Sequence, residues 1–373
     1  ITTDPAPGSL PRLEAIVQQL DKELAAHPVD DETRLLLGRA LAAEITSPEA
    51  RERTQDTTAG VTRHAEEILL AGVDRPGPLR PKFQLGLLDV YRLRSTAVVD
   101  QKPEESKEWV QRGLRLLREL PPELQNSAMA RRAEASLLMT NAAAYNSLGE
   151  PDKAQAAMAE PLAIVRDLAR DPDDLQATAN LALLLENRAL MRWNAGNYAG
   201  YLTDYAEATP LFDHLVRMRS GARFRLAYLR SLRNLAYGHD KMSTPQSSAS
   251  VHKAYDELKK AAADESLGFR PKVDLADLLL NLGIDGKSRP DEALPYAEAA
   301  AKLEPESMNS WESLAEANRQ LGRYHDALIA IDRVLALLEP PKDGEPPTSM
   351  YRDVSAKKRQ ILAEQAAHPA TAP

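Results

Sequence analysis

The sequence predicts an all-α protein built as a solenoid, a stack of antiparallel helix hairpins. Three observations support this prediction. Apolar residues of the stretch 274–341 recur 34 residues apart: Leu280, Ala293, Leu294 and Leu303 return as Leu314, Ala327, Leu328 and Leu337. Aromatic residues make up only 5% of the 373-residue chain, which suits close-packed helices and leaves little for a sheet. Clusters of Pro and Gly interrupt the chain at intervals that fit helix pairs.

The two copies resemble the tetratricopeptide repeat (TPR), whose pattern is W-x2-L-G-x2-Y, then A-x3-F, then P. The second copy reads Trp311-x2-Leu314-Ala315-x2-Asn318, then Ala327-x3-Ile331, then Pro340. The first reads Asp277-x2-Leu280-Asn281-x2-Ile284, then Ala293-x3-Ala297, then Pro305. Both copies depart from the pattern at its Gly and Tyr positions. The resemblance implies a right-handed superhelix of about seven helix pairs plus capping helices, in which the first helix of each pair lines a concave groove.

The N-terminal part is expected to hold divergent pairs. Residues 1–8 are predicted to be a disordered lead-in, and residues 9–120 to form TPR-like helix pairs. Ser9 is suited to cap a helix whose apolar residues fall at three- and four-residue steps, namely Leu10, Leu13, Val17, Leu20 and Leu24. Leu37-Gly38-x2-Leu41 resembles the first helix of the next repeat, with its second helix over about residues 48–70.

Residues 121–269 are predicted to form longer repeats. The turn positions Ala154, Tyr201 and Ala254 lie 47 and then 53 residues apart, instead of 34. Tyr201 stands where the repeat has a small Ala, so the two helices must separate there or the ring must replace other packing. Residues 243–250, rich in Ser, Thr, Pro and Gln, are the most linker-like segment inside the array.

Two regular TPRs are expected over residues 270–341. Residues 342–373 are expected to form a capping helix, over about 350–365, and a frayed tail. An open array needs such a cap because its last apolar face would otherwise meet water.

A second resemblance concerns the longer repeats. Arg170-Asp171-Pro172-Asp173-Asp174, a long Leu/Ala helix and then Gly196-Asn197 resemble TPR arrays attached to bacterial serine/threonine kinases. The kinase motifs themselves are absent from the sequence. This resemblance implies that the chain corresponds to the non-catalytic part of such a protein.

Composition and charge exclude several classes. The formal charge of −8, from 55 acidic and 47 basic residues, argues against a dedicated nucleic-acid binder. The absence of Cys excludes disulfides and thiolate–zinc sites, and no apolar run reaches the roughly 18 residues of a membrane span. The chain begins at Ile1 without Met and looks trimmed. The compartment stays open, with the periplasm or the cell exterior favoured over the cytoplasm.

Catalytic and metal-binding patterns are not supported. His64-x2-Glu67 places two potential ligands one helical turn apart, but a di-iron bundle needs that pair twice with further Glu residues. A solvated helix face explains it better. The acidic clusters at residues 30–32 and 171–174 are explained by helix starts. We therefore expect no cofactor and no enzyme activity.

One basic segment stands out. Residues 214–239 contain no Asp or Glu but six arginines: Arg217, Arg219, Arg223, Arg225, Arg230 and Arg233. On a helix, Arg223, Arg230 and Arg233 share a face with Asn234 and Tyr237, opposite an apolar side formed by Phe224, Tyr228, Leu232, Leu235 and Ala236. Arginine pairs with carboxylates through two parallel hydrogen bonds. The sequence thus predicts a site for an acidic protein or peptide, made of Arg188, Arg192, Trp193, Arg223, Arg230, Arg233, Asn234 and Tyr237.

An alternative explains the same arginines by internal pairing. Acidic residues of neighbouring helices, such as Asp204, Glu207 and Asp256, are available as partners. Trp193 likewise either lines the groove or packs under Tyr198.

The function predicted is that of a non-catalytic scaffold or adaptor that binds a protein or peptide on its concave surface. Two alternatives remain open at this point: the sensor or interaction region of a larger, kinase-associated signalling protein, and a structural subunit of an assembly. The oligomeric state is not predicted.

Overall fold

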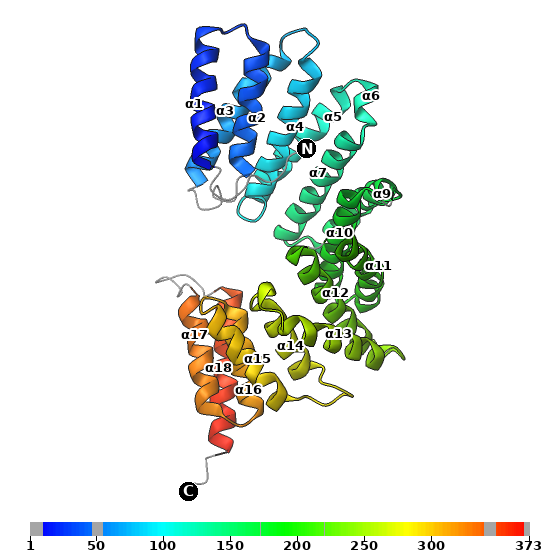
Figure 1. Cartoon of the computed structure of the whole chain (residues 1–373), viewed down its shortest axis with the longest axis vertical. Helices are drawn as coiled ribbons and strands as arrows, with labels where there is room; N and C mark the ends of the chain where they lie inside the picture. The colour runs from blue at the N-terminus through cyan, green and yellow to red at the C-terminus, as the bar shows by residue number, and fades with distance from the viewer. Residues whose placement is uncertain (1–9, 47–54, 172, 220, 339–347, 369–373) are drawn as a thin grey trace. The chain divides into compact units, whose positions relative to one another are not determined.

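The computed structural model describes residues 10–46, 55–171, 173–219, 221–338 and 348–368. Within these residues the regular elements are α-helices, apart from one 3-10 turn at Glu265–Leu267, so the predicted all-α fold is confirmed. Figure 1 shows the helices in chain order. None of the described helices is both long and apolar enough to cross a bilayer. The predicted lead-in, the Ser9 cap and residues 369–373 of the predicted tail lie outside the described residues.

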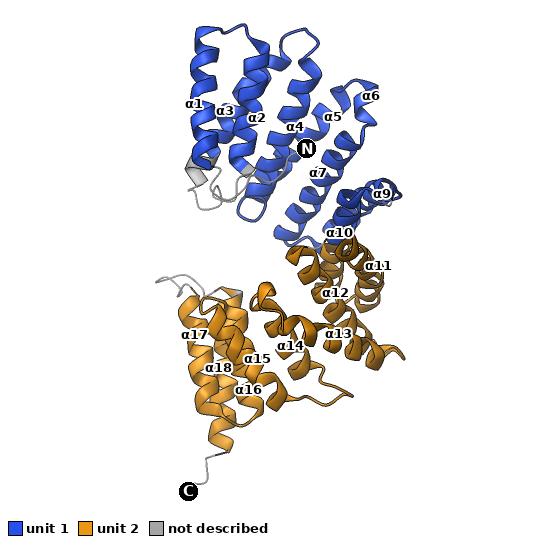
Figure 2. Ribbon diagram, viewed as in Figure 1, with its two compact units in different colours: residues 1–184 blue, residues 185–373 orange. Residues whose placement is uncertain are grey.

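The chain divides into two compact units, residues 1–184 and residues 185–373 (Figure 2). The boundary falls inside helix α10 (Leu175–Asn194). The finer subdivision at residues 120, 269 and 341 stays a prediction.

Unit 1 is a stack of helices that pack on their neighbours in sequence. Their bounds are α1 (Leu10–Ala26), α2 (Asp31–Thr46), α3 (Gln55–Val73), α4 (Arg80–Val98), α5 (Pro103–Glu119), α6 (Pro122–Gln125), α7 (Ala128–Ser147), α8 (Pro151–Ala157) and α9 (Ala159–Leu168). The first helices of successive pairs, α2, α4 and α7, also contact one another. This is the arrangement expected of a repeat array, in which each pair buries its apolar side against the next.

Unit 2 continues the pattern from the end of α10. Its further helices are α11 (Tyr198–Met218), α12 (Ala222–Lys241), α13 (Ser247–Ala262), α14 (Arg270–Asn281), α15 (Pro290–Leu303), α16 (Met308–Gln320), α17 (Tyr324–Leu337) and α18 (Ser349–Ala367). The first helices α12, α14 and α16 contact one another, and α18 packs on α17 as the predicted cap. Counting α8 and α9 as one interrupted helix, the described helices form the seven predicted pairs, with α1 and α18 at the ends.

Helix boundaries follow the local chemistry of the chain. Pro103, Pro151 and Pro290 each occupy the first position of a helix, where the missing N–H has no helical partner to lose. Gly196 and Gly322 follow helix ends with φ of 73° and 71°, a left-handed conformation that glycine adopts without a steric penalty. The turns between first and second helices are therefore specified by single residues.

Glycines also set the spacing of helices in unit 1. A Cβ at Gly72 of α3 would lie 2.4 Å from Cδ1 of Phe83, which is 1% exposed in α4. A Cβ at Gly38 of α2 would lie 2.4 Å from a methyl carbon of Leu69. Large side chains from a neighbouring helix thus fill the space that each glycine leaves open.

Tyr201 shows how a large residue is accommodated at a position that the repeat reserves for Ala. Its ring lies against Gly238 of α12, where a Cβ would be 3.1 Å from the ring carbons. Its hydroxyl donates a hydrogen bond to the Asn234 carbonyl oxygen (3.0 Å). The Tyr201 ring therefore takes the place of other side-chain packing, which was one of the two expectations. Gly238 on the facing helix leaves the space that the ring occupies.

The linker-like segment differs from expectation in part. Helix α13 begins at Ser247, so half of residues 243–250 is helical. The preceding turn is held by Thr244, whose backbone N–H donates to the His239 carbonyl oxygen (3.0 Å) and whose hydroxyl lies 2.7 Å from His239 Nδ1. Ser and Thr favour turns because their side chains bond the nearby backbone, and composition alone did not separate that use from a linker.

Candidate binding groove in unit 2

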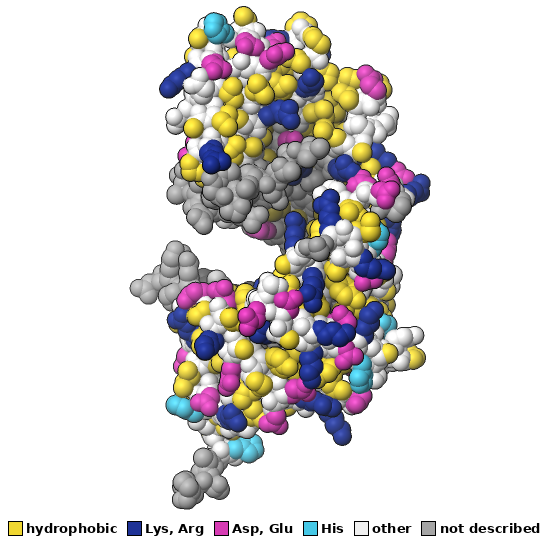
Figure 3. Space-filling model, in the orientation of Figure 1, with side chains coloured by type: hydrophobic (Ala, Val, Ile, Leu, Met, Phe, Trp, Pro, Cys, Tyr) yellow, Lys and Arg dark blue, Asp and Glu magenta, His cyan; other side chains and the backbone are white. Residues whose placement is uncertain are grey.

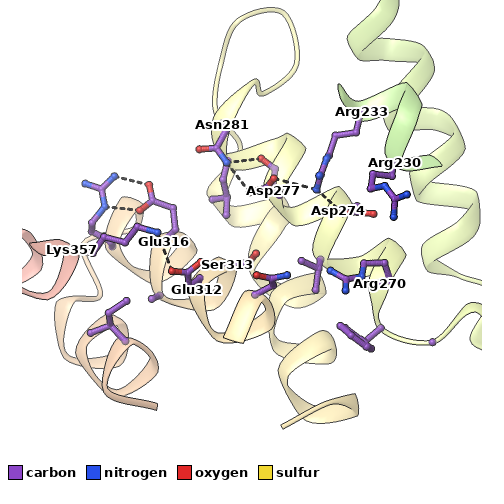
Figure 4. Close-up of a pocket in the computed structure, with 18 of the residues that line it drawn as sticks. Arg230, Arg233, Arg270, Asp274, Asp277, Asn281, Glu312, Ser313, Glu316 and Lys357 are labelled. Atoms are coloured by element: carbon purple, nitrogen blue, oxygen red, sulfur yellow. Dashed lines mark hydrogen bonds and ion pairs between the residues drawn. The ribbon is translucent and has the colours of Figure 1, made fainter. Parts of the chain in front are cut away.

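A polar groove of about 1030 Å³ lies along the first helices of unit 2 (Figure 4). We call it the unit 2 groove. Its walls come from α12, the loop before α14 and α14 along its length, α16, α17 and α18. Its charged and amide side chains are Arg230, Arg233, Arg270, Asp274, Asp277, Asn281, Asn309, Glu312, Glu316, Arg319, Lys357 and Gln360.

Helix geometry explains why these side chains share one surface. On α14, Arg270, Asp274, Asp277 and Asn281 follow one another at three- and four-residue steps, so they form a single polar stripe. Apart from Lys272, the other side chains of α14 are apolar and buried, with Leu275, Leu278 and Leu279 fully enclosed. The stripe is thus turned to the groove because the other faces form the core.

Arg233 of α12 joins two carboxylates of α14. Its Nη1 donates to Asp274 Oδ1 (2.5 Å) and to Asp277 Oδ2 (3.4 Å). The Asp274 side chain is only 4% exposed. Burial raises the pKa values of Asp274 and Asp277, and the Arg233 guanidinium opposes that rise. The pair therefore ties α12 to α14 through charges that are largely withdrawn from water.

Several other groove charges are also paired. Arg230 donates from Nε and Nη2 to the two carboxylate oxygens of Glu186, both at 2.7 Å. Arg319 binds Glu316 through Nη2 (2.6 Å), and Lys357 donates to Glu312 (3.1 Å). Figure 3 shows the same intermixing of positive and negative side chains over the face of unit 2 that it presents. The groove is consequently a preformed polar surface and not a region of one charge sign.

The predicted site residues are only partly brought together. Of the eight, Arg230 and Arg233 line the groove. Tyr237 lies beside it, where its hydroxyl donates to the carbonyl oxygen (3.3 Å) and Oδ2 (3.4 Å) of Asp277. Burial raises the pKa of this tyrosine hydroxyl. Arg223 is exposed in the first turn of α12 and does not line the groove.

Asn234 differs from its predicted place on an exposed face. It is 9% exposed, and its amide donates to the Tyr205 hydroxyl (2.7 Å). Because α12 packs against α11, α13 and α14, more of its circumference is covered than a single apolar stripe indicates. Asn234 thus belongs to the contact between α11 and α12.

Arg188, Arg192 and Trp193 lie at the end of α10 and pack on α11. Arg188 and Arg192 both pair with the buried carboxylate of Asp204, Arg192 at 2.9 Å. Trp193 packs its ring against Tyr198 and Tyr201, with ring centroids 4.9 and 4.8 Å apart. Asp204, expected as a partner for the arginines of residues 214–239, pairs with Arg188 and Arg192 instead. Within that segment, Arg230 and Arg233 are paired internally, but with Glu186 and Asp274. A role of these residues in binding a partner stays a prediction.

The site predicted from the sequence does not include Arg270, the acidic residues of α14 and α16, or Asn309. A pattern in the two regular repeats was sufficient to identify these residues. Polar residues at three- and four-residue steps occur on both first helices, over residues 270–281 and again over residues 309–316. Combined with the expectation that first helices line the groove, this spacing identifies the lining of α14 and α16.

Comparisons with known proteins agree with the fold. The sequence matches no protein-family model, and no curated protein sequence matches it significantly. The structure is similar to that of BtubC (BKLC) from P. vanneervenii, with a TM-score of 0.53 and 14% identity over 68% of this chain and 91% of that one.

Two further solved structures contain tetratricopeptide repeats. One is a tetratricopeptide repeat protein from Parabacteroides merdae, with a TM-score of 0.45 and 14% identity over 82% of this chain and 94% of that one. The other is a signal transduction ATPase with a tetratricopeptide repeat sensor from Pyrococcus horikoshii, with a TM-score of 0.49 and 13% identity over 95% of this chain and 47% of that one. The helix pairs and their 34-residue period give this chain a TPR-like fold, and identities this low concern the fold alone. The likeness to kinase-attached arrays stays a prediction.

Proposed function

We propose that the chain is a non-catalytic scaffold that holds a segment of another protein in the unit 2 groove. The observation that carries this proposal is the groove itself, formed by the first helices of consecutive pairs and lined by side chains fixed in ion pairs. A surface that is ordered before binding loses little conformational entropy when a partner arrives.

The lining favours a polypeptide over an apolar small molecule. Small-molecule pockets are mostly apolar and measure about 300–1,000 Å³, whereas about half of the residues that line this groove carry charged or amide side chains. Asn281 and Asn309 are exposed on adjacent first helices. A side-chain amide both donates and accepts hydrogen bonds, which matches the backbone amides of an extended segment.

A blocking experiment tests the proposal. A random peptide library displayed on phage is selected against the whole chain, and the enriched peptides are synthesised and measured by fluorescence anisotropy. Asn309→Trp places a large ring in the groove from an exposed position, and we expect it to weaken these peptides by about tenfold or more, equivalent to about 1.4 kcal/mol.

The matched control is Lys302→Trp. Lys302 is also exposed, in the last turn of α15, and does not line the groove. We expect it to leave the affinities unchanged. A library that yields no specific peptide, or peptides indifferent to Asn309→Trp, would show that the groove is not the binding surface.

A further inference from the structure

Arg270 differs from the other cations of the unit 2 groove. Arg230, Arg233, Arg319 and Lys357 each have a carboxylate oxygen within ion-pair distance. Among the described residues, no carboxylate oxygen lies that close to Arg270. It lies against the neighbouring Phe269 ring, whose centroid is 5.3 Å from the guanidinium carbon. Arg270 therefore forms no direct ion pair with a described residue, although its charge acts at longer range on the buried Asp274 carboxylate.

Folding stability accounts for Arg270 only in part. Its charge attracts the buried Asp274 carboxylate, but Arg270 is the first residue of α14, where the partial positive charge of the helix N-terminus disfavours a cation. Asp274, one turn further along α14, is engaged by Arg233 instead. Arg270 is exposed, so little apolar burial compensates. Its position is understandable if a ligand supplies the missing acceptor.

A second arginine lies on the same side of the groove. Arg230 uses Nε and Nη2 for Glu186, which leaves Nη1 without a bond to that carboxylate. Arg230 and Arg270 both act electrostatically on Asp274, so they flank the same point of α14. Figure 4 shows both side chains at this end of the groove, while Glu312, Glu316 and Lys357 lie at the other.

We propose that Arg270, assisted by Arg230, binds the side-chain carboxylate of an Asp or Glu in the polypeptide that occupies the groove. The inference rests on the proposed function and adds the chemical class of the occupant. A guanidinium presents its N–H donors in a planar fork that fits a carboxylate. The site differs from the arginine face predicted from the sequence, because Arg270 lies outside that set and Arg233 is already paired.

The test uses the whole chain and four labelled probes measured by fluorescence anisotropy. Three are N-acetylated, C-amidated peptides that alternate Ala with Glu, with Gln or with Lys, and the fourth is the Gln peptide with a free C-terminal carboxylate. We expect the Glu peptide to bind best. Arg270→Gln is expected to weaken it about tenfold or more, since a charge-assisted hydrogen bond contributes more than a neutral one.

Two controls separate this site from general attraction between charges. Arg352→Gln removes one positive charge from an exposed position on α18 that does not line the groove, and we expect less than about a twofold change, because exposed distant charges are screened. Arg270→Gln is also expected to melt close to the temperature of the unsubstituted chain, because relief of the unfavourable helix N-terminus offsets the lost attraction to the Asp274 carboxylate.

Several results would overturn the inference while leaving the proposed function intact. These are stronger binding of the Lys peptide, binding that requires only the free C-terminus, equal losses in Arg270→Gln and Arg352→Gln, or library peptides that bind the groove without Asp or Glu. A library that yields nothing at the groove would instead remove the proposed function.

Discussion

At the scale of single residues, the interior ion pairs decide which charges are available to a partner. The sequence identified an arginine-rich helix correctly, but Arg230 and Arg233 are bound to acidic residues 44 and 41 positions away in the chain. Helical periodicity gives the face of a residue and not the helix that lies opposite. Arg270, the groove arginine for which the described residues offer no carboxylate partner, lies outside the predicted cluster.

The Arg233–Asp274 pair makes a prediction about stability and pH. Arg233→Met leaves Asp274 buried without its partner, so we expect a loss of about 3–5 kcal/mol in unfolding free energy at neutral pH. Burial already raises the pKa of Asp274 above its ordinary value of 3.8, and loss of Arg233 raises it further. A carboxyl with a raised pKa holds its proton more tightly when folded, so the loss should shrink as pH falls toward that raised pKa.

Denaturant unfolding at several pH values measures this dependence. Arg217→Met serves as the control, because Arg217 pairs with Asp213 on the exposed surface of α11 and should contribute less than about 1 kcal/mol. A loss in Arg233→Met that is equal at neutral and acidic pH would contradict the assignment of Asp274 as the stranded charge.

At the scale of elements, sequence signals located most helices because Pro and Gly mark their ends directly. The exceptions have local causes. Ser247–Ser250 joined α13 although its composition suggests a linker, and Met158 separates α8 from α9. Contacts between helices were harder to predict from the sequence, because a glycine in a helix does not indicate which large side chain of the neighbouring helix packs against it.

Two glycines of α3 test that packing. Gly72→Ala would place a Cβ 2.4 Å from the Phe83 ring, and Phe83 is enclosed, so we expect a net loss of about 1–3 kcal/mol. Gly60→Ala, in the same helix, meets nothing within 4 Å and should gain about 0.5–1 kcal/mol from helix propensity. Circular dichroism melts compare the two, and a gain in both would show that Phe83 yields easily.

At the scale of the whole molecule, the seven helix pairs were predictable because a 34-residue period occurs twice near the C-terminus and clusters of Pro and Gly mark the turns of the pairs before it. The division into two compact units was not, since it falls inside the continuous helix α10 without any break in composition. The sequence predicted that first helices line a concave groove, but not which residues form the unit 2 groove. Its lining depends on which first helices come together, and that is a property of the stack.

The division into two units predicts which helices are destabilised by a given substitution. In a repeat array each pair contacts only its neighbours, so local openings stay local. Arg233→Met should speed amide hydrogen exchange in α12 and α14 and leave α2 to α5 unchanged, whereas Gly72→Ala should do the reverse. Hydrogen exchange followed by mass spectrometry distinguishes these patterns, and uniform acceleration along the chain would indicate a single cooperative unit.

The contact of Tyr201 with Gly238 also limits how this sequence is able to change over generations. A side chain at position 238 meets the ring, and a small residue at position 201 leaves a void and removes the hydrogen bond to the Asn234 carbonyl oxygen. A lineage that returns to the small residue typical of the repeat must therefore pass through a less stable ancestor or alter both codons together. Positions 201 and 238 are therefore expected to change together during evolution, although they lie 37 residues apart in the sequence.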